Sequence, residues 1–146
     1  IANPKNFSVL LGTNYQELVE AAGGFKTEPE KVISGGPMMG QALFDLSIPV
    51  AKTSSALTCL GKDAVAELEP TACIRCGRCV QVCPGRVVPQ KIMKAAERHD
   101  LEAFVKLNGM ECCECGCCAY ICPARRPLTQ AFKEMRKAVA MSRKKA

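Results

Sequence analysis

The sequence has few large aromatic side chains from which to build a core. Its 146 residues include five Phe, two Tyr and no Trp, although 48% of the residues are apolar, which excludes a mainly disordered chain. Two small domains with so few aromatic residues need another source of stability. The eleven cysteines indicate what that source is.

Several other signals are also missing. The sequence contains no apolar run of about 18 residues and no signal peptide, so we expect a soluble, unexported chain. It has no initiator Met, which indicates a fragment of a longer polypeptide. It has neither a dinucleotide fingerprint nor a phosphate-binding helix start, so we expect no NADH site and no catalytic residue of its own.

The patterns in the first half predict a small α+β unit. Residues 7–10 alternate apolar and polar side chains as a strand does, and a helix should follow with Thr13 as its N-cap. Residues 31–34 and 48–52 have the pattern of further strands, the second at a sheet edge because it contains a proline. Residues 53–71 give weak signals and are expected to form a connector.

In the second half, cysteine runs alternate with helical patterns. Residues 89–98 and 100–107 are predicted to be helices, the second closed by Asn108 and Gly109. Pro127 should open a last helix whose apolar face consists of Leu128, Phe132, Met135 and Val139. We expect the cysteine-rich segment to lack an apolar core of its own and to depend on metal for its fold.

Ten of the eleven cysteines lie within residues 73–123, in two copies of the motif C-x2-C-x2-C-x3-C-P. The first copy consists of Cys73, Cys76, Cys79 and Cys83. The second copy consists of Cys112, Cys115, Cys118 and Cys122. This spacing is typical of ferredoxin-type sites, because a curled backbone lets three thiolates reach three irons of one cubane. Two complete copies therefore predict two [4Fe-4S] clusters.

The fourth cysteine of each copy is expected to bind the other cluster, as it does in two-cluster ferredoxins with this motif. Cluster one is assigned to Cys73, Cys76, Cys79 and Cys122. Cluster two is assigned to Cys112, Cys115, Cys118 and Cys83. The exchange ties the two copies together and keeps the clusters close enough for an electron to tunnel between them. The predicted function is electron transfer.

Three cysteines fall outside this frame, namely Cys59, Cys113 and Cys117. A frame shifted to use Cys113 would need a cysteine at the position of Gly116, and one shifted to use Cys117 would need a cysteine at the position of Glu114. We expect all three thiols outside the frame to pack passively. Paired C-x2-C units also occur in zinc sites, and a structural zinc module is kept as a distant alternative. An odd number of cysteines and the missing secretion signal argue against a disulfide scaffold.

Positive charge is concentrated in the second half. Residues 1–72 hold 5 Lys and Arg against 8 Asp and Glu, whereas residues 73–146 hold 15 against 6. A basic half often binds nucleic acid or an anionic surface. Here two oxidised clusters with their thiolates would cancel about four of the excess positive charges. We therefore expect no nucleic acid partner, but docking of the second half to acidic redox proteins.

Two further features are ambiguous. The segment Gly35-Gly36-Pro37-Met38-Met39-Gly40 lacks the spacing of a phosphate loop and predicts a turn, although its methionines could contact a cofactor or partner. The basic side chains of the last helix could contact an acidic partner or anionic lipid, or form a solvated tail. His99 lies at a junction between helices and is assigned no role.

In combination these motifs resemble a known family. A Gly-Gly-Phe25 helix end, the segment Val32 to Gly40 and the run Cys73 to Cys79 follow one another as in the C subunits of bacterial Rnf (Rsx) ion-translocating electron-transport complexes. The resemblance covers nearly all 146 residues and implies a C-terminal fragment of such a protein. It implies an α+β fold with an SLBB-like β-grasp domain (1–65), a two-cluster [4Fe-4S] ferredoxin-type domain (66–128) and a basic helix or tail (129–146).

The same resemblance implies a setting for the electron transfer. The parent protein would belong to a membrane-associated NADH:ferredoxin oxidoreductase that translocates Na+ or H+, and would lie peripherally on the cytoplasmic face of the bacterial inner (plasma) membrane. Its expected partners are the other subunits of that complex and ferredoxin-like or flavin redox proteins. The FMN and NADH sites would lie in an N-terminal region absent from this sequence.

One position departs from the family pattern, and one other family has a similar arrangement. Gly85 follows Cys83-Pro84 where we expect a bulkier apolar residue, which would alter the exposure of a cluster. The flavoprotein corrinoid (cobalamin) reductases of bacterial microcompartments share the arrangement. An electron-transfer part of such a reductase is therefore the alternative function.

Overall fold

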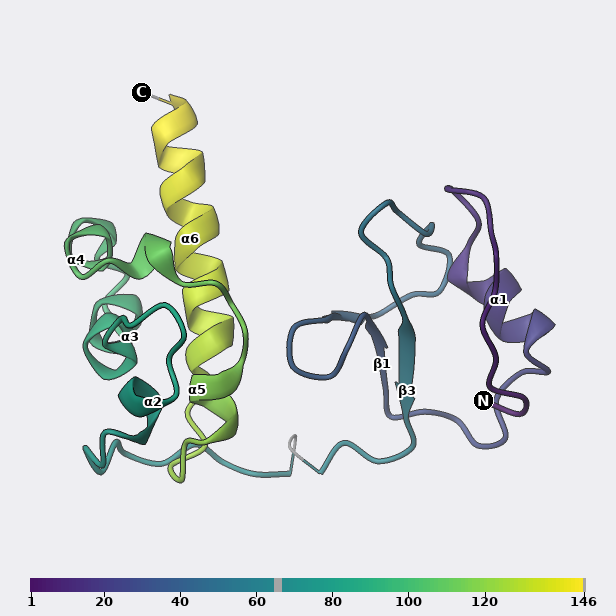
Figure 1. Cartoon of the computed structure of the whole chain (residues 1–146), viewed down its shortest axis with the longest axis horizontal. Coiled ribbons are helices and arrows are strands. Elements are labelled where there is room, and N and C mark those ends of the chain that lie inside the picture. The colour runs from purple at the N-terminus through teal and green to yellow at the C-terminus, as the bar shows by residue number, and fades with distance from the viewer. Residues whose placement is uncertain (65–66, 146) are drawn as a thin grey trace. The chain divides into compact units, whose positions relative to one another are not determined.

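The computed structural model describes residues 1–64 and 67–145. The chain folds into two compact units, Ile1–Glu67 and Leu68–Ala146, and Figure 1 labels most of their helices and strands. The predicted domain boundary at residues 65 and 66 lies outside the described residues. Each unit has its own core and is considered by itself.

The first unit combines one helix with a three-stranded antiparallel sheet of order β2-β1-β3. Its elements are α1 (Tyr15–Ala21), β1 (Lys31–Ser34), β2 (Gln41–Leu43) and β3 (Leu57–Leu60). Tyr15 is only 3% exposed. Its hydroxyl donates a hydrogen bond to Ser54 Oγ at 2.8 Å and is hydrogen-bonded with Ser34 Oγ at 2.6 Å, so it joins the helix to β1. Ile33, at the centre of the sheet, is also buried.

The first unit differs from the sequence-based prediction in several places, one of which is strand β3 within the expected connector of residues 53–71. Residues 7–10 form no strand. The helix N-cap is Asn14, whose N–H donates to the Glu17 carboxylate at 3.3 Å, while the predicted cap Thr13 donates to the Leu10 carbonyl. Residues 48–52 contribute only one bridge, between Asn14 and Pro49, because proline has no N–H to extend the ladder.

The second unit is built from helices that follow and precede the cysteine loops. Helices α3 (Pro89–Glu97), α4 (Leu101–Lys106) and α6 (Leu128–Lys145) pack against one another, as Figure 1 shows. The short helices α2 (Arg78–Gln81) and α5 (Cys117–Tyr120) lie within the two cysteine runs, and the 3-10 turn η1 (Gly109–Glu111) precedes the second. Asn108 adopts the left-handed conformation at the predicted helix end, with φ of 60°.

An apolar core joins the three long helices. The side chains of Ile92, Phe104 and Phe132 are fully shielded from solvent, and the two phenyl rings lie 6.4 Å apart, in a tilted arrangement. The predicted apolar face of α6 is the buried face of that helix. The expectation that the cysteine-rich half lacks its own core is therefore wrong, because the helices between and after the runs bury these side chains together.

The close approach of η1 to α4 yields a prediction about stability. A Cβ added at Gly109 would lie 2.6 Å from the fully buried Phe104 ring, whereas one added at Gly61 meets nothing within 4 Å. We expect Gly109→Ala to lower the free energy of unfolding of the second unit by about 1–3 kcal/mol, because the ring has no space into which to move. Gly61→Ala, in the first unit, should change the free energy of unfolding of that unit by less than about 0.5 kcal/mol. Denaturant titration followed by helical circular dichroism checks both, and equal effects would contradict the packing described here.

Candidate metal centre

The two cysteine runs have the same backbone conformation. Arg75 and Glu114, each two residues after the first cysteine of its run, both have φ of 57°. Gly77 and Gly116 follow the second cysteine with φ of 76° and 84°, and each begins a short helix. Left-handed residues at these positions curl the chain so that the thiols of one run face a common space. The repeat in the sequence is therefore a repeat in the fold.

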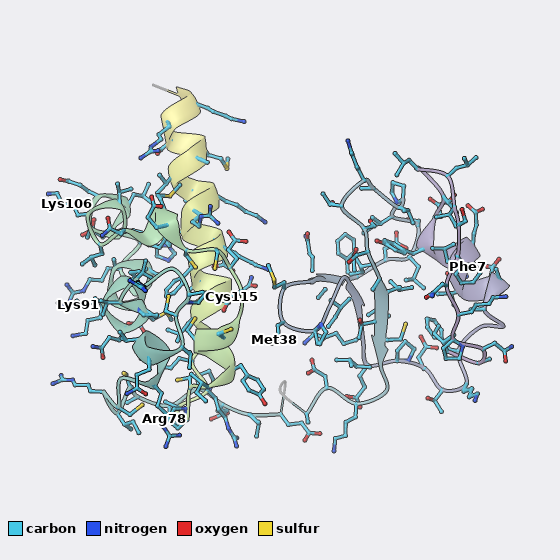
Figure 2. The ribbon with its side chains drawn as sticks, in the orientation of Figure 1. Phe7, Met38, Arg78, Lys91, Lys106 and Cys115 are labelled. Atoms are coloured by element: carbon cyan, nitrogen blue, oxygen red, sulfur yellow. The ribbon has the colours of Figure 1, made fainter. Side chains whose placement is uncertain are left out.

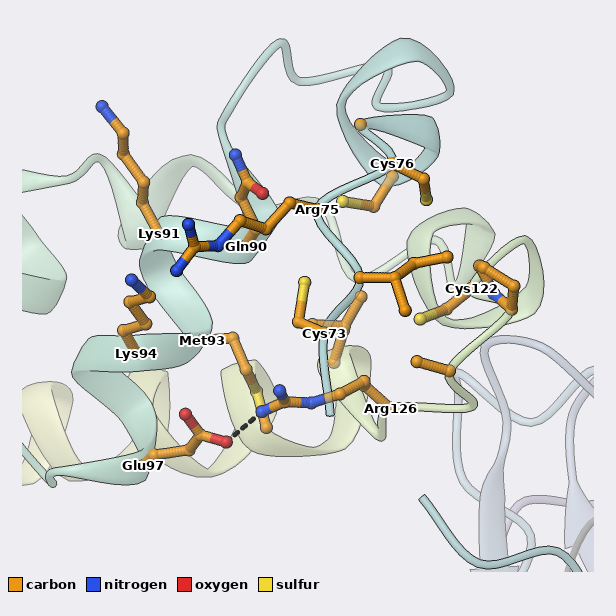
Figure 3. A pocket seen from close by; sticks show the side chains of 16 residues that line it. Cys73, Arg75, Cys76, Gln90, Lys91, Met93, Lys94, Glu97, Cys122 and Arg126 are labelled. Carbon is orange, nitrogen blue, oxygen red and sulfur yellow. Dashed lines mark hydrogen bonds and ion pairs between the residues drawn. The ribbon is translucent and has the colours of Figure 1, made fainter. Parts of the chain in front are cut away.

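A cavity of about 410 Å³ lies at the first run. Its thiols come from Cys73, Cys76, Cys79 and Cys122. The fourth of these belongs to the second run, and Figure 3 shows Cys122 facing the loop of Cys73 and Cys76. Cys73 and Cys76 are exposed, whereas Cys79 and Cys122 are half-buried.

A second cavity lies at the second run, and it is small, at about 10 Å³. Its thiols come from Cys83, Cys112, Cys113, Cys115 and Cys118. Cys118 is buried, and Phe132 and Thr129 of α6 close the inner side. The Glu114 N–H donates to Cys112 Sγ at 3.4 Å, an amide-to-sulfur contact of the kind that stabilises a bound cluster.

Each cavity thus holds the four thiols that the sequence assigns to one cluster. Within residues 1–64 and 67–145, no three His, Cys, Asp or Glu side chains converge on a point where one metal ion would bind. The thiols surround a space, and thiolates are the ligands that iron–sulfur clusters take. Both cavities fit a cluster by their donor sets, and the first, at about 410 Å³, leaves far more space between its thiols than the second, at about 10 Å³.

Burial affects the protonation of several of these thiols. It raises the pKa of Cys79 and Cys112, and it raises the pKa of Cys118 to about 11. Cys118 Sγ also lies 3.8 Å from Thr129 Oγ1. At neutral pH these thiols are protonated in the absence of metal, so metal binding must release their protons.

The charges that line the two cavities differ. Arg75, Lys91 and Lys94 line the first, and Arg126 lines it while paired with Glu97 of α3 (Figure 3). At the second cavity the only charged lining residue among those described is Glu114, which is paired with Arg136. No motif marks the α3 residues, which sequence reasoning missed. Lys91 and Lys94 lie on the same face of α3 because they are about one helical turn apart, and both line the first cavity.

The three cysteines outside the frame have different surroundings. Cys59 lies in β3 opposite Val32, half-buried in the first unit, and burial raises its pKa. Cys117 begins α5 and does not line either cavity. Cys113 is exposed and lines the second cavity, which places it among the assigned ligands. Passive packing of these thiols stays a prediction.

Comparison with known families identifies two domains in this chain. The model of the SLBB domain matches residues 1–42, and the model of the 4Fe-4S dicluster domain matches residues 66–123. The C subunit of the Na(+)-translocating ferredoxin:NAD(+) oxidoreductase complex of Acetobacterium woodii is 42% identical over 99 residues, which are 68% of this chain and 22% of that protein. The C subunit of the proton-translocating complex of Clostridium ljungdahlii is 46% identical over 92 residues, or 63% of this chain and 20% of that protein.

This chain is a homologue of these C subunits. The C subunit of the ion-translocating oxidoreductase complex of Rhodobacter capsulatus is also similar, at 41% identity over 107 residues, 73% of this chain and 21% of that protein. The chain therefore spans about a fifth of the length of these relatives. The resemblance inferred from the sequence motifs is confirmed.

The match to these relatives also confirms the predicted fold class and cofactor type. The chain is an α+β protein with an SLBB unit and a 4Fe-4S dicluster unit. The dicluster domain and its cysteine-rich stretch support two [4Fe-4S] clusters as the cofactors. The named relatives are subunits of multi-subunit complexes. Among the described residues, no helix combines the length and the apolar character needed to span a bilayer.

Proposed function

We propose that this chain conducts electrons through two [4Fe-4S] clusters within an ion-translocating NADH:ferredoxin oxidoreductase complex. The single observation that carries the proposal is the pair of cavities, each lined by the first three motif cysteines of one run and the fourth motif cysteine of the other. A bound cluster supplies one-electron acceptance and donation. The relatives supply the setting, since two of them are subunits of ferredoxin:NAD(+) oxidoreductase complexes.

The protein's own residues have four tasks in this function. The thiolates of Cys73, Cys76, Cys79 and Cys122 would hold the first cluster. Those of Cys112, Cys115, Cys118 and Cys83 would hold the second. The left-handed turns orient backbone N–H groups toward sulfur, and the core of the second unit fixes the spacing of the two sites.

The rest of the parent protein would supply the other steps. We place the FMN and NADH sites in the part of the parent that this chain does not span, and the parent itself peripherally at the cytoplasmic face of the membrane. Its partners would be the other subunits of the complex and ferredoxin-like or flavin redox proteins. The similarity to C subunits favours this setting over a corrinoid reductase.

Metal content tests the proposal. We expect anaerobically prepared protein to be brown, with broad visible absorption and about eight irons and eight sulfides per chain, because each complete motif holds one cubane. Chemical iron and sulfide analysis with electron paramagnetic resonance of the reduced protein measures this. Stoichiometric zinc without sulfide would instead support the zinc module. Oxidation of NADH by the chain alone would contradict the placement of that site elsewhere in the parent.

A further inference from the structure

The two cluster sites differ in their access to the surface of the second unit. The first cavity is about 410 Å³ and two of its thiols, those of Cys73 and Cys76, are exposed. Ile74 between them is 66% exposed. The second cavity is about 10 Å³, contains the buried Cys118 and is closed on its inner side by α6. A partner protein can therefore come closer to a cluster at the first site than at the second.

The first site is also surrounded by more positive charge than the second. Arg75 lines the first cavity, and the same position of the second run holds Glu114, with the same backbone conformation. Lys91 and Lys94 add two positive charges from α3, and Lys91 extends outward from that helix in Figure 2. Among the described residues, none of these three cations has an ion pair, whereas Arg126 is neutralised by Glu97.

We propose that the basic rim of the first cavity, formed by Arg75, Lys91 and Lys94 together with exposed Ile74, is the docking surface for an acidic electron-transfer protein. The inference rests on the proposed function, because it takes the first site to hold a cluster. In the exchange, one electron passes between the partner's redox centre and that cluster. The centre that gives the electron is oxidised, the centre that receives it is reduced, and no bond forms or breaks. The second site then serves as the internal relay.

Charge complementarity favours an acidic partner even after a cluster is bound. An oxidised cubane with four thiolates contributes about two negative charges, fewer than the three positive charges of the rim. Like-charged partners would be repelled, and opposite charges steer association at low ionic strength. The exposed apolar side chain of Ile74, which lines the same cavity, suits a small contact that excludes water.

The basic end of α6 lies far along that helix from the first cavity. Arg143 and Lys144 lie near the end of α6, whereas the cavity contacts that helix at Leu128. At a rise of 1.5 Å per residue, the two positions are about 24 Å apart along the helix. Docking there would keep a partner remote from the cluster, so these residues provide a matched control.

The test compares two charge reversals with the same change in net charge. The rim variant is Arg75→Glu/Lys91→Glu, and the control variant is Arg143→Glu/Lys144→Glu. The rim variant should fold, because Glu114 already shows that glutamate fits the left-handed position of Arg75. The probe is a small acidic [2Fe-2S] ferredoxin, titrated onto cluster-loaded protein at low and at high ionic strength, with binding and single-turnover electron transfer both measured.

We expect the rim variant to bind the probe at least tenfold more weakly than the wild type at low salt, and the control variant within about twofold. The difference should disappear near 1 M salt, where the Debye length is about 3 Å. Equal weakening by both variants, an unaffected rim variant, or no binding of the probe by the wild type would each overturn the docking assignment.

Measurement of the iron content distinguishes a failure of the docking proposal from a failure of the proposed function. A wild type with about eight irons and an unchanged resonance signal, but without dependence on the rim, would refute only the docking surface. A wild type without iron and sulfide would refute the proposed function itself. The variant Arg75→Lys, which keeps the charge, should bind the probe as the wild type does, so loss of binding there would also overturn the charge argument.

Discussion

Alanine at Cys83 should remove the remaining cluster from a protein that has already lost the first, whereas alanine at Cys122 should leave it in place. The background for this test is Cys73→Ala/Cys76→Ala, which removes two ligands of the first site and should reduce the iron content from about eight to about four. If the fourth cysteines are exchanged, Cys83 belongs to the cluster that survives. Its loss should reduce the iron further, while Cys122 is no longer needed.

The geometry predicts this direction because each cavity combines thiols from both runs. Cys122 lines the cavity of Cys73, and Cys83 lines the cavity of Cys112. Two variants that differ only in which fourth cysteine is removed therefore give opposite results. With unexchanged ligands the same pair of variants would give the reverse outcome, so the experiment decides between the two assignments.

One residue needs its own control in this series. Cys113 lines the second cavity and could replace a lost thiolate, so every variant should also be prepared with Cys113→Ala. Cys113→Ala alone should keep about eight irons, as should Cys59→Ala in the first unit. Iron and sulfide analysis with electron paramagnetic resonance distinguishes an intact cubane from a three-iron product. Loss of a cluster in Cys113→Ala alone would show that the frame is wrong.

The cysteine half of the molecule was predictable because its constraints are local. Spacing within each run determines which positions curl the backbone, and Gly77 and Gly116 both have positive φ. The apolar face of α6 was also predictable, since a helix repeats its contacts at a fixed period. The assignment of cysteines to the two clusters rests on the same motif and stays a prediction.

The first unit was harder to predict because its short strands depend on tertiary partners. Residues 7–10 alternate as a strand should, yet they are exposed and no partner strand pairs with them among the described residues. The real strand β3 lies within a segment that gave weak signals, and it is a strand because it pairs with β1. Strand propensity largely reflects such surroundings, which a single sequence does not contain. Lys91 and Lys94 of α3 were not predicted to line the first cavity, because which face of a helix meets a cavity also depends on tertiary contacts.

The core of the second unit determines what should remain when iron is removed. We expect protein stripped of its clusters to keep helices α3, α4 and α6 but to lose order in the two cysteine loops. The helices bury Ile92, Phe104 and Phe132 without any contribution from metal. The loops consist of short turns whose residues 73–82 are mostly exposed, so a metal would supply most of their order.

Hydrogen exchange on apo protein measures this directly. Amides of α3 and α6 should remain protected, while those of Arg78–Gln81 in α2 should exchange almost as in an unfolded chain. Most of the helical circular dichroism should persist. Complete loss of that signal would show that the unit is folded only when metal is bound, and uniform protection of the loops would show that packing alone orders them.

A core variant makes the prediction quantitative. A domain of this size has a stability of about 4–12 kcal/mol, and the apo unit, without the contribution of bound metal, should lie toward the lower end. Phe132→Ala removes a fully buried ring at a cost of about 3–5 kcal/mol, so it should unfold the apo unit. The cluster-loaded variant should stay folded, because metal that binds only the native state adds its binding free energy to the stability. Equal stability of Phe132→Ala with and without clusters would mean that the core and the cysteine loops do not fold as a coupled unit.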